Sequence, residues 1–159
     1  MAEEYSPPPV LVLGVGNILL SDEGVGIRVI EELQRSYSFP PSIELVDGGT
    51  LGHALIDVLR GRQKVLVIDA VKTDGPPGAI YRFNVKDLSP ASSRMTSVHD
   101  IGVAEAVFFL NLQGELPPDI EFYGIQPQSI EPGLEMTPVV AVSARKVQFM
   151  VLKDLGITH

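Results

Sequence analysis

The chain alternates short apolar runs with segments of helical periodicity. Residues 10–16 (VLVLGVG) and 64–71 (KVLVIDAV) are almost continuously apolar, which is typical of strands covered on both faces in a parallel sheet. Residues 42–47 (SIELVD) and 120–127 (IEFYGIQP) predict two further strands. Residues 79–85 (AIYRFNV) alternate between apolar and polar positions and predict an extra strand, antiparallel or at an edge.

Helical segments separate these predicted strands. Residues 23–35 carry apolar side chains at helical spacing on one face, namely Val25, Val29, Ile30 and Leu33. Three more helices are predicted at residues 51–60, 99–112 and 138–155, the last with Pro138 suited to the first helical position. This alternation predicts a single three-layer α/β/α domain. Its twisted, mostly parallel sheet has about five strands, with right-handed crossovers and helices on both faces.

Length and composition agree with one folded unit. The 159 residues are 45% hydrophobic and 20% charged, and the mean hydropathy is +0.21, so we expect one domain with a filled core. Residues 1–9 contain three consecutive prolines, which cannot join a central strand. We therefore expect a flexible N-terminal tail over residues 1–9 and the folded domain over residues 10–159.

Charge and cysteine content exclude several classes of partner and site. The formal net charge of -8 and the pI near 4.8 leave no basic surface for nucleic acid or for anionic lipid. The chain has no cysteine, which excludes disulfides and thiolate metal sites. No segment resembles a signal peptide or a membrane span. We expect a cytoplasmic protein and, since no amphipathic helix is obviously unpartnered, a monomer.

Polar side chains follow the predicted strands at the edge where parallel strands end, and in such sheets this edge carries the functional crevice. The residues in question are Asn17, Asp22 and Glu23 after the first strand, Asp47 after the second, Asp69 after the third, His99 and Asp100 near the start of the third helix, and Gln126 and Gln128 after the last strand. The sequence therefore predicts several carboxylates and one imidazole at one edge.

Glu23, Asp69 and His99 form the most suggestive set. Asp69 ends the most apolar run of the chain, where an ionised carboxylate needs a partner to offset its desolvation. His99 lies at a predicted helix start, and the positive helix end favours the neutral imidazole that binds metals. Two carboxylates and one imidazole suit a borderline divalent ion such as nickel, zinc, manganese or iron.

Each member of this set also has a simpler explanation. Glu23 could be an acid in the first turn of a helix capped by Ser21, and Asp47 and Asp69 could form turns. The other histidines, His53 and His159, lie in a helical pattern and at the chain end, and no role is expected for them.

A nucleotide site is the alternative for the first strand and its turn. Gly14 and Gly16 resemble the start of a dinucleotide fingerprint, and Asp47 could take the place of the acid that binds ribose. Leu19, however, replaces the third glycine. Asp22 and Glu23 stand at the predicted helix start, where they would repel a phosphate. The nucleotide reading is thus the weaker one.

Five motifs in order resemble those of the hydrogenase maturation endopeptidases, which process the large subunit of [NiFe] hydrogenases. They are GVGNILLSDEGVG, DGGT, VIDAV, SVHDIG and GIQPQSIEPGLEMTP, and the resemblance covers roughly residues 10–155. It implies an endopeptidase that removes a C-terminal extension from the large-subunit precursor after nickel has been inserted. The partner implied is that precursor. A nickel-dependent chaperone of hydrogenase assembly that does not cut is the alternative.

The family's metal-binding positions fall on Glu23, Asp69 and His99. In many members aspartate stands in place of Glu23, so the glutamate of this chain reaches one methylene further. The resemblance implies that these residues complete the coordination of the substrate's nickel, although other divalent ions could occupy the same site. In a competing hypothesis the ion, or a carboxylate of Asp22, Asp47 or Asp69, activates a water for peptide hydrolysis.

Substrate contacts are predicted on three turns at the same edge. Asn17 and the glycines Gly48 and Gly49 are candidates for holding the substrate backbone, although a tight turn explains the glycines equally well. Gln126 is a further candidate, because the segment 126–138 that it begins is expected to shape the rim of the cleft.

Overall fold

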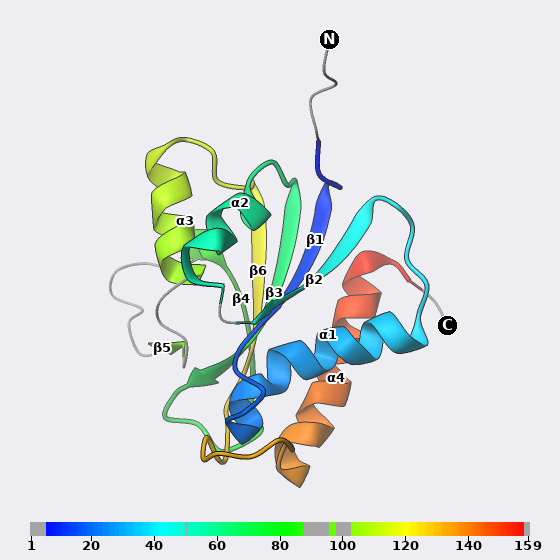
Figure 1. Cartoon of the computed structure of the whole chain (residues 1–159), viewed down its shortest axis with the longest axis vertical. Helices are drawn as coiled ribbons and strands as arrows, with labels where there is room; N and C mark the ends of the chain where they lie inside the picture. Colours follow the sequence, from blue (N-terminus) through cyan, green and yellow to red (C-terminus); the bar gives the residue numbers. More distant parts are fainter. Residues whose placement is uncertain (1–5, 50, 88–95, 98–102, 158–159) are drawn as a thin grey trace.

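A twisted sheet forms the middle of the molecule (Figure 1). The computed structural model describes residues 6–49, 51–87, 96–97 and 103–157. The strands are β1 (Val10–Val15), β2 (Ile43–Gly49), β3 (Lys64–Lys72), β4 (Ile80–Asn84), β5 (Thr96–Ser97) and β6 (Asp119–Ile125). The main path runs β2-β1-β3-β6-β4, with β5 paired to β3. Neighbours are parallel, except that β4 is antiparallel to β6 and β5 is antiparallel to β3.

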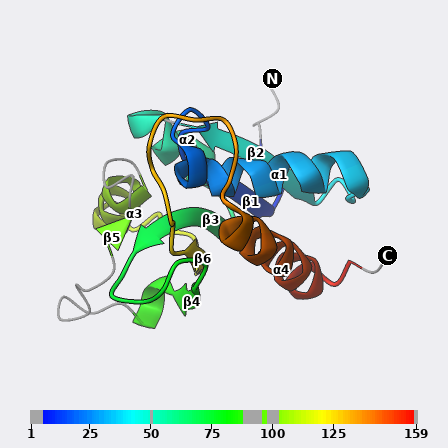
Figure 2. The ribbon, with the colours of Figure 1, turned by 90° about the horizontal axis from the view of Figure 1, so that it is seen from below.

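Helices cover both faces of the sheet (Figures 1 and 2). They are α1 (Val25–Ser36), α2 (Leu55–Leu59), α3 (Val103–Leu112) and α4 (Pro138–Leu155), with 3-10 turns η1 (Ser21–Gly24), η2 (Gly52–Ala54) and η3 (Val85–Asp87). The buried residues of α1 and α4 pack on one face, and those of α2 and α3 pack on the other. The predicted α/β/α layering is confirmed.

Strand β3 separates the two cores. Its side chains alternate between them, so that Leu66 and Ile68 pack with α1 and α4, while Val65 and Val67 pack with α2 and α3. Asp69 continues the second series, because alternate side chains of a strand share a face. The carboxylate predicted from the sequence therefore lies in the C-terminal half of the central strand, on the side of α2 and α3, and the strand continues for three residues beyond it.

Two glycines let the start of α1 lie directly on the sheet. A Cβ atom on Gly26 would stand 2.2 Å from the carbonyl oxygen of Ile68, and one on Gly14 would stand 2.4 Å from the carbonyl oxygen of Gly26. No side chain fits at such distances. This packing brings the turn η1, which carries Glu23, next to the C-terminal half of β3, which carries Asp69.

The structure departs from the sequence prediction at element ends. The helix predicted over residues 23–35 begins at Val25, because residues 21–24 form η1. The helix predicted over residues 51–60 is divided into η2 and the short α2. The strand β5 was not predicted, since two residues carry no periodic pattern. Helix α3 begins at Val103, and residues 99–102 of the predicted helix lie outside the described residues.

The last prolines of the predicted tail contact the loop before β3. Arg62 donates to the carbonyl oxygen of Pro8 over 2.8 Å, and the amide of Gln63 donates to that of Pro9 over 2.8 Å. Residues 1–5 lie outside the described part of the chain. No helix within the described residues is long and apolar enough to cross a membrane.

Candidate functional site

The turn after β1 is joined to the loop that follows β6. The amide of Ser21 donates to the carbonyl oxygen of Gly133 over 2.9 Å, and the amide of Gly133 donates to that of Leu19 over 2.8 Å. Ser21 has a positive φ of 54°. Its hydroxyl donates to the carbonyl oxygen of Glu131 over 2.7 Å, so the expected helix cap at Ser21 is not formed. These hydrogen bonds fix the turn after β1 and the loop after β6 to each other (Figure 2).

Asp22 is the centre of this junction. The residue is fully buried, and its Oδ2 accepts the amides of Gln128 over 2.9 Å and Ser129 over 3.0 Å. Thr137 donates its amide to Oδ1 over 2.7 Å and its hydroxyl to Oδ2 over 2.8 Å. Four hydrogen bonds satisfy a carboxylate that would otherwise be costly to bury. The geometry favours a role for Asp22 in positioning the loop over the predicted role in activating water.

Glu23 and Asp69 are both buried at the same edge, with exposed fractions of 7% and 3%. Asp69 Oδ1 accepts the amide of Ala70 over 2.8 Å. The contact of Gly26 with Ile68 brings η1 and β3 together, as described above. Two acids with little access to solvent on these neighbouring elements make a region of concentrated negative charge. This arrangement suits a cation and opposes an anion.

The third member of the predicted triad, His99, lies outside the described residues, as does Asp100. The described residue nearest to His99 in the sequence is Ser97 in β5, which pairs with Val71 of β3. Within the described ranges, no group of three or more histidine, aspartate or glutamate residues is placed to hold a metal ion. The triad of Glu23, Asp69 and His99 thus stays a prediction.

Asp47, Gly48 and Gly49 are the last residues of β2, where its register with β1 shifts. Asp47 is exposed, and its Oδ1 accepts the amide of Gly49 over 2.9 Å. Gly49 has a φ of 45°, and a Cβ atom on Gly48 would lie 2.8 Å from Leu13 Cδ1. The positive φ at position 49 favours glycine, and a side chain at position 48 would crowd β1. The predicted catalytic and substrate-binding roles of these residues stay predictions.

Asn17 stabilises a local turn, and Gln126 joins the end of β6 to the residue that follows β3. Asn17 Oδ1 accepts the amide of Leu19 over 2.9 Å. Gln126 Oε1 accepts the amide of Thr73 over 2.6 Å and its hydroxyl over 3.0 Å. Both side chains have a structural partner, and their predicted contacts with substrate stay predictions. Sequence reasoning missed Thr137, because a threonine before a helical proline is read as a helix cap and not as a partner of a distant acid.

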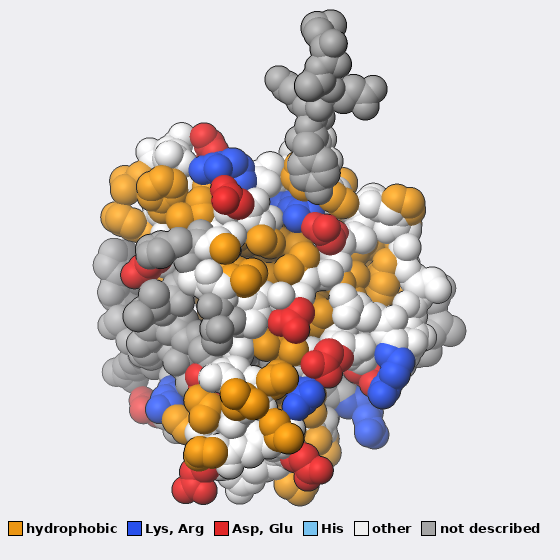
Figure 3. Space-filling model, in the orientation of Figure 1, with side chains coloured by type: hydrophobic (Ala, Val, Ile, Leu, Met, Phe, Trp, Pro, Cys, Tyr) orange, Lys and Arg blue, Asp and Glu red, His pale blue; other side chains and the backbone are white. Residues whose placement is uncertain are grey.

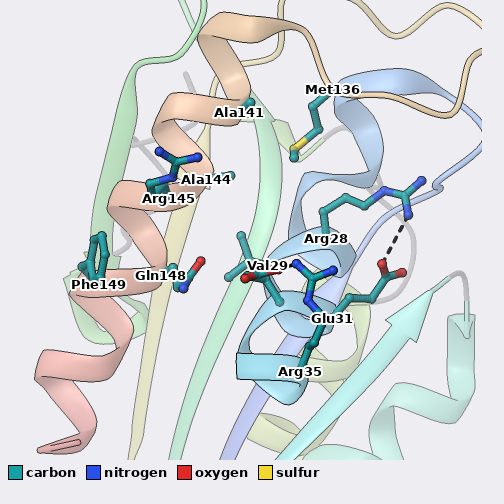
Figure 4. A pocket seen from close by; sticks show the side chains of 11 residues that line it. Arg28, Val29, Glu31, Arg35, Met136, Ala141, Ala144, Arg145, Gln148 and Phe149 are labelled. Atoms are coloured by element: carbon teal, nitrogen blue, oxygen red, sulfur yellow. Dashed lines mark hydrogen bonds and ion pairs between the residues drawn. The ribbon is translucent and has the colours of Figure 1, made fainter. Parts of the chain in front are cut away.

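Two hollows lie on opposite faces of the sheet. A groove of about 690 Å³ runs between α1 and α4 and is lined by Arg28, Arg35 and Arg145 among others (Figure 4). None of the predicted site residues lines this groove. The second hollow, of about 600 Å³, lies beside α3 and includes Asp69. Only the second hollow is therefore continuous with the candidate site.

Comparisons with known proteins identify the family. A family model described as HycI, hydrogenase maturation protease, matches residues 27–154. The hydrogenase 2 maturation protease of Escherichia coli K12 is 36% identical over 147 residues, covering 92% of this chain and 90% of that protein.

Solved structures agree with the sequence comparison. The hydrogenase maturating endopeptidase HybD of E. coli superposes with a TM-score of 0.84 at 34% identity, covering 92% of this chain and 91% of that one. A hydrogenase 2 maturation peptidase from a Thaumarchaeota archaeon has a TM-score of 0.71 at 34% identity, covering 94% and 99%. The chain belongs to the hydrogenase maturation protease family and is a peptidase.

Proposed function

We propose that the chain removes the C-terminal extension of a [NiFe] hydrogenase large-subunit precursor after nickel insertion. In this proposal Glu23, Asp69 and His99 complete the coordination of the substrate's nickel. The precursor is the partner, and nickel arrives as part of it. The observation that carries the proposal is the burial of Glu23 on η1 and of Asp69 on the neighbouring strand β3, in a chain that belongs to this protease family.

Electrostatics supports metal recognition at this edge. Two carboxylates shielded from solvent on neighbouring elements make a region of negative charge that attracts a divalent cation. A precursor that carries nickel brings this cation with it, whereas a precursor without nickel does not. The acids would therefore favour the loaded precursor. Oxygen and imidazole ligands suit nickel among the borderline ions.

The position of β5 supports the inclusion of His99. Ser97 pairs with Val71, which follows Asp69 by two residues, and His99 follows Ser97 by two residues. His99 is therefore two residues along the chain from Ser97, which pairs with the strand that carries Asp69. The chain connectivity is compatible with one metal shared by both side chains.

Peptide hydrolysis requires a group that takes a proton from the attacking water. Among the three candidate acids, Asp22 is fully engaged by the loop, and Asp47 is exposed near the end of β2. Asp69 is the acid that borders an open hollow. Under the competing hypothesis, in which a carboxylate activates the water, Asp69 is therefore the favoured base, and Asp22 is a positioning residue.

Intact-mass analysis of the cognate precursor tests the proposal. The precursor is prepared with and without nickel, and each form is incubated with the wild-type protein, with His99→Ala and with the control His53→Ala. We expect the wild type and the control to shorten only the loaded form, and His99→Ala to leave both forms intact. Cleavage of both forms by the wild type would remove nickel recognition from the proposal. Tight nickel-dependent binding without cleavage would favour the chaperone instead.

A further inference from the structure

The hollow beside α3 has the size and lining of a binding site. It lies between α3 and the face formed by β3, β6 and β4, and its volume is about 600 Å³, inside the range of roughly 300–1,000 Å³ typical of ligand sites. The described residues that line it are Asp69, Val71, Phe83, Val85, Lys86, Val103, Ala104, Val107, Phe108, Asn111, Leu116, Phe122 and Tyr123.

The walls of the hollow are apolar and aromatic. The rings of Phe83 and Phe122 stack with centroids 5.0 Å apart and planes 7° apart, which gives a flat surface. Val71 and Val103 are each only 5% exposed and lie deep in the hollow. Phe108, on the rim, is 66% exposed. A large aromatic side chain exposed beside an apolar hollow is typical of an interaction site.

The hollow is continuous with the candidate site through β3. Asp69 and Val71 both line it, and they lie two residues apart on one face of the strand, which is about 7 Å. Successive residues of an extended peptide are about 3.3 Å apart. A peptide bond held at Asp69 would therefore have a side chain, one or two residues away, at the level of Val71.

We propose that this hollow is the subsite that receives an apolar side chain of the precursor, from a residue within two positions of the scissile bond. The proposal rests on the proposed function, because Asp69 marks the reacting end. Apolar side chains gather on the exposed surface over α3 (Figure 3), and Phe108 of this helix borders the hollow. A precursor segment fits this position better than a second copy of the chain, because a permanently docked copy would cover the hollow beside Asp69.

Two neighbouring phenylalanines provide a matched test by steady-state kinetics on the nickel-loaded precursor. Phe108 lines the hollow, whereas Phe109, on the same helix and 40% exposed, does not. We expect Phe108→Ala to raise KM roughly tenfold with little change in kcat, and Phe109→Ala to leave KM unchanged. Ala104→Trp, placed on the exposed rim to fill the hollow, should raise KM at least as much. Equal effects of Phe108→Ala and Phe109→Ala, or none from Phe108→Ala and Ala104→Trp, would overturn the proposal.

A binding measurement separates this inference from the proposed function. A peptide that spans the precursor's cleavage site is added to the protein with labelled valine and leucine methyl groups, and NMR shifts are followed. We expect shifts at Val71 and Val107 that disappear in Ala104→Trp, whether or not the peptide is cut. Shifts confined to other regions, or none, would overturn the subsite. Failure of the wild type to shorten the precursor would instead count against the proposed function.

Discussion

Thr137 donates both its amide and its hydroxyl to the carboxylate of Asp22, over 2.7 Å and 2.8 Å. The two residues are 115 positions apart in the sequence. Thr137 is also the residue before Pro138, the first residue of α4. The contact therefore fixes the start of the C-terminal helix to the turn after the first strand, immediately before Glu23.

Asp22→Asn should destabilise the protein strongly. The substitution removes the charge and places an NH₂ group among four donors, so at least one hydrogen bond is lost in a fully buried position. We expect the free energy of unfolding to fall by about 2–4 kcal/mol, measured by urea denaturation. Asp47→Asn, at an exposed position, is the control and should change it by less than about 0.5 kcal/mol. Equal losses would show that Asp22 has no special role.

Gly26→Ala should disturb both stability and activity. The added methyl group would meet the carbonyl oxygen of Ile68 at 2.2 Å, so α1 must move away from β3, at a cost of about 1–3 kcal/mol. Because Glu23 precedes α1 and Asp69 follows Ile68, cleavage of the loaded precursor should fall as well, even where the variant is fully folded. Gly114→Ala, which has a φ of 70° and no atom within 4 Å, should lose about 1 kcal/mol and keep full activity.

Glu23→Gln and Glu23→Asp should differ in activity. The amide loses the negative charge that binds the substrate's nickel, whereas aspartate keeps it at a shorter reach. We expect Glu23→Gln to lower the cleavage rate of the loaded precursor by about 100-fold or more, since losing even an outer partner of a metal ligand costs roughly 10–100-fold. Glu23→Asp should keep most of the activity. A fully active Glu23→Gln in the mass assay would exclude Glu23 as a ligand.

Arg62→Met should loosen the connection between residues 7–9 and the sheet. Arg62 is 6% exposed and donates to the carbonyl oxygens of Val58 over 3.0 Å and Pro8 over 2.8 Å, as well as to Glu44. We expect a loss of about 1–3 kcal/mol in thermal or urea unfolding, with faster amide exchange near Pro9. Arg35→Met, whose side chain is 77% exposed, should change stability by less than about 0.5 kcal/mol.

Most of the fold could be predicted because its signals are local and strong. The apolar run of β3 and the proline at the start of α4 each determine an element with little help from the rest of the chain. Element starts were less predictable. Ser21 was expected to cap a helix, but its hydroxyl donates to the carbonyl oxygen of Glu131, 110 residues away. No local sequence pattern predicts such a distant partner.

The candidate site, like the fold, could be predicted only in part. Strand ends place Glu23 and Asp69 at one edge, and topology alone predicts this. The role of Asp22 could not be predicted, because its sequence neighbours make it look identical to Glu23, and only the position of Gln128, Ser129 and Thr137 distinguishes them. The hollow beside Asp69 could not be predicted from the sequence either, because its walls come from β3, β4, β6 and α3 and not from any one segment.

The bond between Thr137 and Asp22 has a consequence for the order in which the site is assembled during synthesis of the chain. The segments that carry Glu23 and Asp69 leave the ribosome well before residue 137, but until then the carboxylate of Asp22 cannot bind Thr137. A nascent chain thus holds the acids of its site without the junction that orients them. The full set of hydrogen bonds around Asp22 can therefore form only after residue 137 has been made.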